Sequence, residues 1–160
     1  MNFCEYLADF ARDALSGSGS GSGAGAGSGS GSGSGAGFGL DAEVYSNVDP
    51  AREWNGAATV EFNEPNDPQT RTFLSGGSEV TRDVYAIARA ATQSEADSLK
   101  TVLRDICESA ASRLLSENKI YAWAVDETGT TADARGIVEG ESFYGYVRLI
   151  LTERNGYGGQ

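Results

Sequence analysis

The stretch from Asp83 to Leu115 reads DVYAIARAATQSEADSLKTVLRDICESAASRLL, and its hydrophobic period changes at Thr92. Before Thr92 the residues alternate as in a β-strand. One face carries Val84, Ala86, Ala88 and Ala90, and the other carries Asp83, Tyr85, Ile87 and Arg89. Because both faces are partly apolar, we expect a central strand over Val80 to Ala91 that helices cover on one side. A helical interpretation of its alanine-rich end stays open, since short apolar runs are ambiguous.

After Thr92 the pattern becomes helical. Thr92 and Glu95 have the spacing of a capping box, in which the threonine hydroxyl accepts from the amide three residues on. Apolar residues then recur at intervals of three and four, which is typical of an amphipathic helix that ends near Leu115. We expect Leu103 and Ile106 to pack against the preceding strand.

The flanking sequence supplies the remaining elements. Met1 to Leu15 predicts a short helix, with Asn2 as its cap and the stripe Phe3, Leu7, Phe10 and Ala14. Alternation predicts strands over Ala42–Tyr45, Ala58–Phe62, Arg71–Leu74, Lys119–Val125 and Phe143–Thr152. This order favours an α+β fold, a mostly antiparallel sheet with two helices packed on one face, plus a long glycine-rich extended segment.

The expected organisation has four parts: an N-terminal helix (1–15), a Gly/Ser/Ala low-complexity segment (16–39), the α+β domain (40–154) and a loose tail (155–160). Glycine takes every odd position from Gly17 to Gly39. Such a run is either a flexible tether or an extended strand with all of its side chains on one face. We favour an extended, partly paired segment that contacts other subunits, because bare backbone can lie close to a neighbour.

The charge balance excludes several classes of function. The net charge is −11, histidine is absent, and only two of the twelve basic residues are lysines. Such a surface repels nucleic acid, and it suits a high-salt environment in which screening relieves self-repulsion. No apolar stretch is long enough to span a membrane, and the acidic first 15 residues do not resemble a signal peptide.

The chemistry of common active sites is missing from the sequence. Without histidine there is no Ser-His-Asp or Cys-His arrangement, and neither the zinc-site patterns nor a phosphate-binding glycine loop is present. Cys4 and Cys107 lie in helical patterns and are interpreted as small buried hydrophobes. We therefore expect no enzyme activity, catalytic residue, cofactor or metal.

Two clusters keep alternative interpretations open. Acidic residues gather between Asp126 and Glu141, where carboxylates serve catalysis or Ca²⁺ binding, or form a solvated hairpin. The aromatic residues Tyr121, Trp123, Tyr144 and Tyr146 form either a ligand patch or cross-strand packing. In both cases the structural interpretation is favoured.

The segment from Asp83 to Ala96 is a strand ending in Arg-Ala, followed by a capped helix starting with Glu-Ala. It resembles the tail-terminator (minor capsid) proteins of long-tailed viruses. The acidic loop Asp126-Glu-Thr-Gly129 and a final strand extend the resemblance to the order of elements from Met1 to Arg154, apart from the glycine run. The resemblance implies a structural protein of the virion neck or tail, assembled in the host cytoplasm. It implies a ring, usually a hexamer, that caps the tail tube and joins it to the head.

The partners implied by this resemblance are other copies of the chain, the tail tube protein and the head-tail connector protein, while DNA passes through without specific binding. The residues expected at subunit contacts are Gly17, Gly27, Gly37 and Phe38 in the glycine run, and Asp126, Glu127, Asp133 and Arg135 in the acidic region. Two alternatives remain: a head-closure protein of the same kind of particle, and a free-standing binding module for a small ligand.

Overall fold

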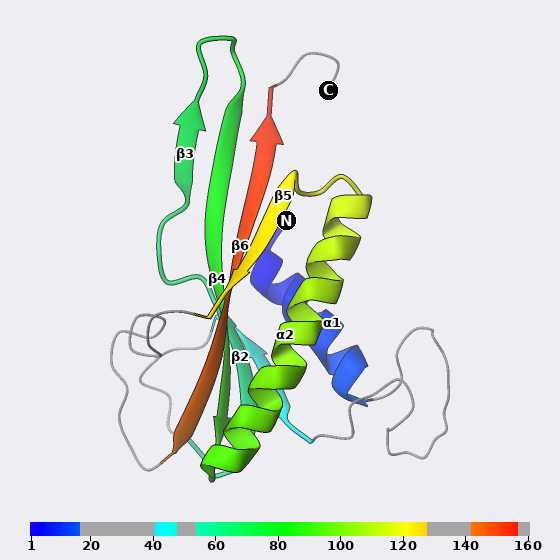
Figure 1. Ribbon diagram of the computed structural model, residues 1–160, viewed down its shortest axis with the longest axis vertical. Helices are drawn as coiled ribbons and strands as arrows, with labels where there is room; N and C mark the ends of the chain where they lie inside the picture. Colours follow the sequence, from blue (N-terminus) through cyan, green and yellow to red (C-terminus); the bar gives the residue numbers. More distant parts are fainter. Residues whose placement is uncertain (17–40, 48–53, 128–141, 157–160) are drawn as a thin grey trace.

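The computed structural model describes the placement of residues 1–16, 41–47, 54–127 and 142–156 (Figure 1). Within these ranges the helices are α1 (Phe3–Ser16) and α2 (Gln93–Ser116). The strands are β1 (Glu43–Ser46), β2 (Thr59–Asn63), β3 (Gln69–Thr72), β4 (Ser78–Ala90), β5 (Ala122–Asp126) and β6 (Phe143–Asn155). Almost all of the glycine run lies outside the described residues, so the extended segment stays a prediction.

All six strands belong to one sheet. Their order is β1-β2-β4-β6-β5, and β3 pairs with the part of β4 that β2 does not reach. β1 runs parallel to β2, and every other pair is antiparallel. The predicted α+β fold with a mostly antiparallel sheet is therefore confirmed.

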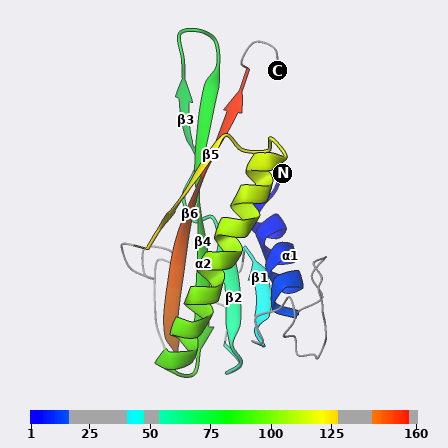
Figure 2. The same cartoon turned by 45° about the vertical axis from the view of Figure 1, so that its right-hand side comes forward.

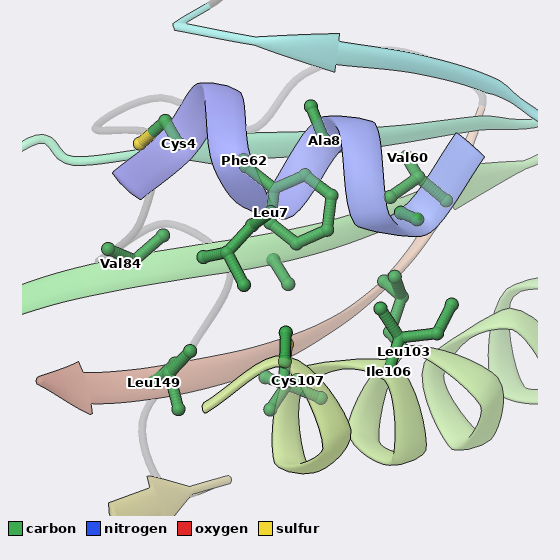
Figure 3. Packing of buried hydrophobic residues seen from close by; sticks show 14 of the residues in the cluster. Cys4, Leu7, Ala8, Val60, Phe62, Val84, Leu103, Ile106, Cys107 and Leu149 are labelled. Carbon is green, nitrogen blue, oxygen red and sulfur yellow. The ribbon is translucent and has the colours of Figure 1, made fainter. Parts of the chain in front are cut away.

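Both helices cover the same face of the sheet, as predicted. α1 packs over β1 and β2, while α2 packs over β4, β5 and β6 (Figure 2). Phe62 of β2, Leu7 of α1 and Leu103 of α2 are fully buried in the layer between helices and sheet (Figure 3). This layer forms the main hydrophobic core, because each helix can bury its apolar face only against the sheet and the other helix.

The two faces of β4 separate as the alternation predicts. Val84 and the alanines at 86, 88 and 90 belong to the main core under the helices. Tyr85 and Ile87 form a second, smaller cluster on the opposite face with Tyr146. The segment is extended through Ala90, so the helical interpretation of its alanine-rich end is wrong.

Side-chain caps start both helices. The Glu5 amide donates to Asn2 Oδ1 at 3.2 Å, and the Glu95 amide donates to Thr92 Oγ1 at 3.2 Å. Each cap satisfies an amide that has no partner within its helix. The sequence therefore located both helix starts correctly.

Several strand boundaries, those of β3, β5 and β6 among them, and the buried face of α1 differ from the sequence predictions. β3 begins at Gln69 and ends at Thr72, because the chain turns at Phe73 to Gly77, where the Phe73 amide donates to the Gly77 carbonyl at 2.8 Å. β5 begins only at Ala122, after Asn118 takes a left-handed backbone with φ 59°. β6 continues to Asn155, one residue into the expected tail. The buried face of α1 is turned toward Cys4, Ala8 and Ala11, which leaves Phe10 and Ala14 at its margin.

Small residues let α2 lie close to the sheet. Gly145 of β6 is the register partner of Ala88 on the helix-covered face. A Cβ atom added to Gly145 would lie 2.9 Å from Lys100 Cβ and 3.1 Å from the Ala96 carbonyl oxygen. Glycine is needed here for close approach of the two elements.

We predict that Leu103→Ala or Ile106→Ala lowers the free energy of unfolding by about 2–5 kcal/mol, the usual cost of truncating a buried aliphatic side chain. Both residues are at most 1% exposed. Urea unfolding measures the loss, with Ser112→Ala on the exposed face of α2 as the control. A loss no larger than that of the control would show that this face of α2 is not buried.

We predict that Gly145→Ala lowers the free energy of unfolding by about 1–3 kcal/mol, the usual cost of overpacking. The added methyl group would push α2 away from β6, since one of its contacts is backbone. Ser109→Ala, on the exposed face of the same helix, serves as the control in the same urea titration. Unchanged stability would mean that the helix is free to shift.

Candidate functional site

A three-stranded arm projects from the sheet beyond the helices. β3, the first residues of β4 and the last residues of β6 lie side by side there, with Ser78 paired to both Thr72 and Asn155. The arm extends past the end of α2 (Figure 1). The stretch of β4 before its buried half, from Ser78 to Asp83, spans about 20 Å at roughly 3.3 Å per residue. Neither helix covers most of this ribbon.

The tip of the arm presents a leucine to solvent. Leu74 lies in the turn between β3 and β4 and is fully exposed, at 110% of its reference area. Gly76 closes the turn with a φ of +100°, a conformation that side chains rarely adopt, and its amide donates to the Phe73 carbonyl at 3.0 Å. The turn therefore holds an apolar side chain at the end of a defined structure.

Ion pairs cross the arm on both of its faces. On the helix side, Arg82 bonds Glu153 of β6 at 2.9 Å and Glu64 at 3.1 Å. On the other side, Arg154 bonds its register partner Glu79 at 2.9 Å. Each partly exposed pair contributes at most about 1 kcal/mol, but together they bind the strands without an apolar core. Bonding to Glu153 and Glu64 raises the pKa of Arg82, so its charge persists at any physiological pH.

β3 forms an open edge of the sheet. All four of its residues are exposed, and its only strand partner in the described part of the chain is β4. An open edge offers backbone donors and acceptors to a strand from another molecule. The edge and Leu74 therefore give the arm two ways to contact a partner.

A hollow of about 320 Å³ lies where the end of α1 meets β1. Its lining consists of Arg12, Leu15, Ser16, Asp41, Ala42 and Val44. The Arg12 guanidinium donates to the Val44 carbonyl at 3.0 Å, which occupies an outward-facing backbone group of the edge strand β1. The elements that line this hollow, the end of α1 and β1, lie far from the turn between β3 and β4 at the tip of the arm (Figure 2).

The two described acidic residues expected at subunit contacts have partners within the chain. Asp126 accepts from Arg148 at 3.3 Å, and Arg148 also bonds Asp83 at 2.7 Å. Glu127 bonds Lys100 at 3.3 Å and Arg104 at 2.9 Å, which ties the end of β5 to α2. Both carboxylates therefore support the fold, and their role between subunits stays a prediction.

The other expected contact residues, Gly17, Gly27, Gly37, Phe38, Asp133 and Arg135, lie outside the described residues. The acidic cluster after Glu127 does so as well. Among residues 1–16, 41–47, 54–127 and 142–156, no three acidic or cysteine side chains lie close enough to hold a metal ion.

The aromatic residues do not form one ligand patch. Trp123 packs against the main core on the helix side, while Tyr146 belongs to the cluster on the opposite face. The rings of Tyr146 and Tyr85 lie 6.0 Å apart, which is cross-strand packing. Tyr121 is half exposed, with the Arg154 guanidinium 3.3 Å from its ring centre. The favoured interpretation, cross-strand and core packing, is confirmed for Tyr146 and Trp123.

Two features that sequence analysis missed are exposed Leu74 and the environment of Arg89. The Gly76-Gly77 pair signalled a turn, but Leu74 was assigned to the strand before it. Arg89 was placed on the correct face of β4, but its neighbour Trp54 comes from a loop that showed no periodic pattern. Turn geometry and loop packing depend on tertiary contacts that residue periodicity does not carry.

Cys4 and Cys107 are buried hydrophobes, as predicted. They are 1% and 0% exposed, and burial raises the pKa of each thiol to about 12. Because the thiolate is the reactive form, both sulfurs are inert in the folded protein.

We predict that Ellman's reagent at pH 8 labels neither cysteine of the native protein and labels both in guanidinium. Ser75→Cys, in the exposed turn of the arm, should react immediately and show that the reagent is active. Rapid labelling of the native wild-type protein would contradict the burial of the two thiols.

No protein-family model matches the chain, and no curated protein matches it in a sequence comparison. Neither α1 nor α2 is long and apolar enough to cross a membrane. The candidate function therefore depends on the surfaces of the described residues.

Proposed function

We propose that the chain is a structural ring subunit that terminates the tail tube of a long-tailed virus and joins it to the head. The projecting arm, with fully exposed Leu74 at its tip, is the observation that carries the assembly part of this proposal. An exposed leucine on an uncovered ribbon gains nothing in a monomer, whereas burial against a partner recovers its hydrophobic free energy. The identity of the ring follows from the resemblance of the element order and the acidic loop to tail terminators.

A closed ring needs two different complementary surfaces on each subunit, because its contacts are head-to-tail. The arm tip is a projecting surface, and the hollow is a recessed one beside α1 and β1, which lie away from the arm tip. The volume of the hollow, about 320 Å³, is sufficient for a leucine side chain. In the proposed ring, Leu74 of one copy occupies the hollow of the next.

The acidic composition is compatible with a DNA conduit. With a net charge of −11, a ring of identical subunits repels phosphates, so DNA passes without being held. The partners in this proposal are the tail tube protein below the ring and the head-tail connector protein above it.

We predict that the purified protein forms rings in negative-stain images, alone or on added tail tubes, and that Leu74→Ser reduces assembly at least tenfold. Because Leu74 is fully exposed, the melting temperature of the Leu74→Ser variant should equal that of the wild type. Leu115→Ser, at an exposed leucine outside the arm, is the matched control and should assemble normally.

A mixing experiment distinguishes head-to-tail association of the subunits from other modes of association. Leu74→Ser lacks the projecting surface, and Ala42→Glu blocks the hollow, so each alone should remain monomeric. Their mixture has one intact contact and should stop at a heterodimer, visible by light scattering. A wild-type protein that stays monomeric, both alone and with tail tubes, would overturn the proposed ring. Rings formed by both variants would overturn the proposed contact between Leu74 and the hollow.

A further inference from the structure

Arg89 is a partly buried guanidinium that has no carboxylate partner among the residues that the structure describes. Six other described arginines, Arg12, Arg82, Arg104, Arg113, Arg148 and Arg154, each have a carboxylate oxygen within 3.1 Å. In the described part of the chain only Arg71 and Arg89 lack such a partner, although acidic residues outnumber basic ones 23 to 12. Arg71 is exposed on the arm, where water solvates it.

Aromatic rings and a hydroxyl hold the Arg89 side chain in place. Its Cζ lies 4.8 Å from the ring centre of Trp54 and 5.3 Å from that of Tyr144. Its Nε donates to Ser142 Oγ at 2.7 Å. The Trp54 indole is itself fixed, because its N–H donates to the Ala57 carbonyl at 2.6 Å. These contacts orient the guanidinium, and its terminal nitrogens have no acceptor among the residues whose placement is described.

A second, independent observation lies next to Arg89. Thr59 of β2 is the register partner of Arg89, so the two side chains share the sheet face that is opposite the helices. Thr59 is 2% exposed, and its buried hydroxyl has no hydrogen-bond partner in the described ranges of the chain. Buried hydroxyls without partners are rare in folded proteins, since each loses its hydration without compensation.

We propose that Arg89 is the centre of a carboxylate-binding site, framed by Trp54 and Tyr144 and completed by the Thr59 hydroxyl. The planar fork of a guanidinium matches the two oxygens of a carboxylate. The Thr59 hydroxyl supplies one further donor. A bound carboxylate therefore satisfies both groups, neither of which has an anion or acceptor within the described part of the chain.

The charge of the surroundings selects a monoanion. Glu61 lies on the same face of β2, one register position further along, and is 3% exposed. A dianionic phosphate would face this carboxyl group and the net charge of −11, and Arg89 is the guanidinium that the described residues place at the site. A single carboxylate is neutralised by Arg89 alone. Its source is either a free small acid or an acidic side chain of a second copy, and the inference does not rest on ring assembly.

Binding is measured with sodium acetate, against sodium chloride at the same ionic strength. In a Trp123→Phe background, Trp54 is the only tryptophan, and its fluorescence should change saturably with acetate alone. The rise in melting temperature with acetate provides a second measurement that does not depend on Trp54. Equal responses to acetate and chloride in both measurements would overturn the proposal.

Four variants identify the groups involved. Arg89→Gln should abolish the acetate-dependent rise in melting temperature, and Arg89→Lys should weaken binding at least tenfold, because lysine keeps the charge but not the fork. Arg71→Gln, which removes the other arginine without a carboxylate, should bind as the wild type does. Thr59→Val should weaken acetate binding without lowering the melting temperature of the free protein. Wild-type acetate binding by Arg89→Gln would overturn the site.

Light scattering then distinguishes the two sources of the carboxylate. If the carboxylate belongs to a second copy, acetate should reduce the mass of the concentrated wild-type protein. The Arg89→Gln variant should then have a lower mass than the wild type. If it is a free acid, the two masses should be equal while only the wild type binds acetate. The Leu74→Ser variant, which should not form rings, should still bind acetate. This result would keep the test of the carboxylate site independent of ring assembly.

Discussion

The close approach of α2 to β4 and β6 is the contact on which the rest of the structure depends. It requires small residues on both elements: the alanines of β4, Gly145 of β6 and Ala96 of the helix. With the backbones this near, Leu103 and Ile106 fill the remaining space between helix and sheet. Close packing of this kind explains why a strand of alanines can lie at the centre of a stable core.

The lengths of the elements decide where the arm and the covered core lie. β4 and β6 each have 13 residues and pair along their whole length, but the helices cover only the half that contains Val84 to Ala90. The uncovered half becomes the arm, which ion pairs hold together in place of a core. The same strands thus provide a rigid scaffold at one end and an accessible ribbon at the other.

Local patterns predicted most of the fold. The change of period at Thr92, the two caps and the alternation of β4 each reflect interactions within a few residues, and the structure confirms all of them. The parallel pairing of β1 with β2 depends on contacts between residues on either side of a longer connection, so no local pattern contained it. The candidate sites were harder still to predict from the sequence. Leu74 is conspicuous only because it is fully exposed, and Arg89 only because none of the described carboxylates reaches it.

The distribution of ion pairs gives Arg89 its significance. In a chain this acidic, a carboxylate is available to nearly every arginine, and the pairs at Arg82, Arg148 and Arg154 show that the sheet uses them across its strands. Placing a guanidinium between two aromatic rings removes part of its hydration, a cost that cation–π contact only partly offsets. An anion from outside the described chain would complete that compensation. Arg89 lies near the end of β4 opposite the arm, so the proposed carboxylate site and exposed Leu74 are at different ends of this strand.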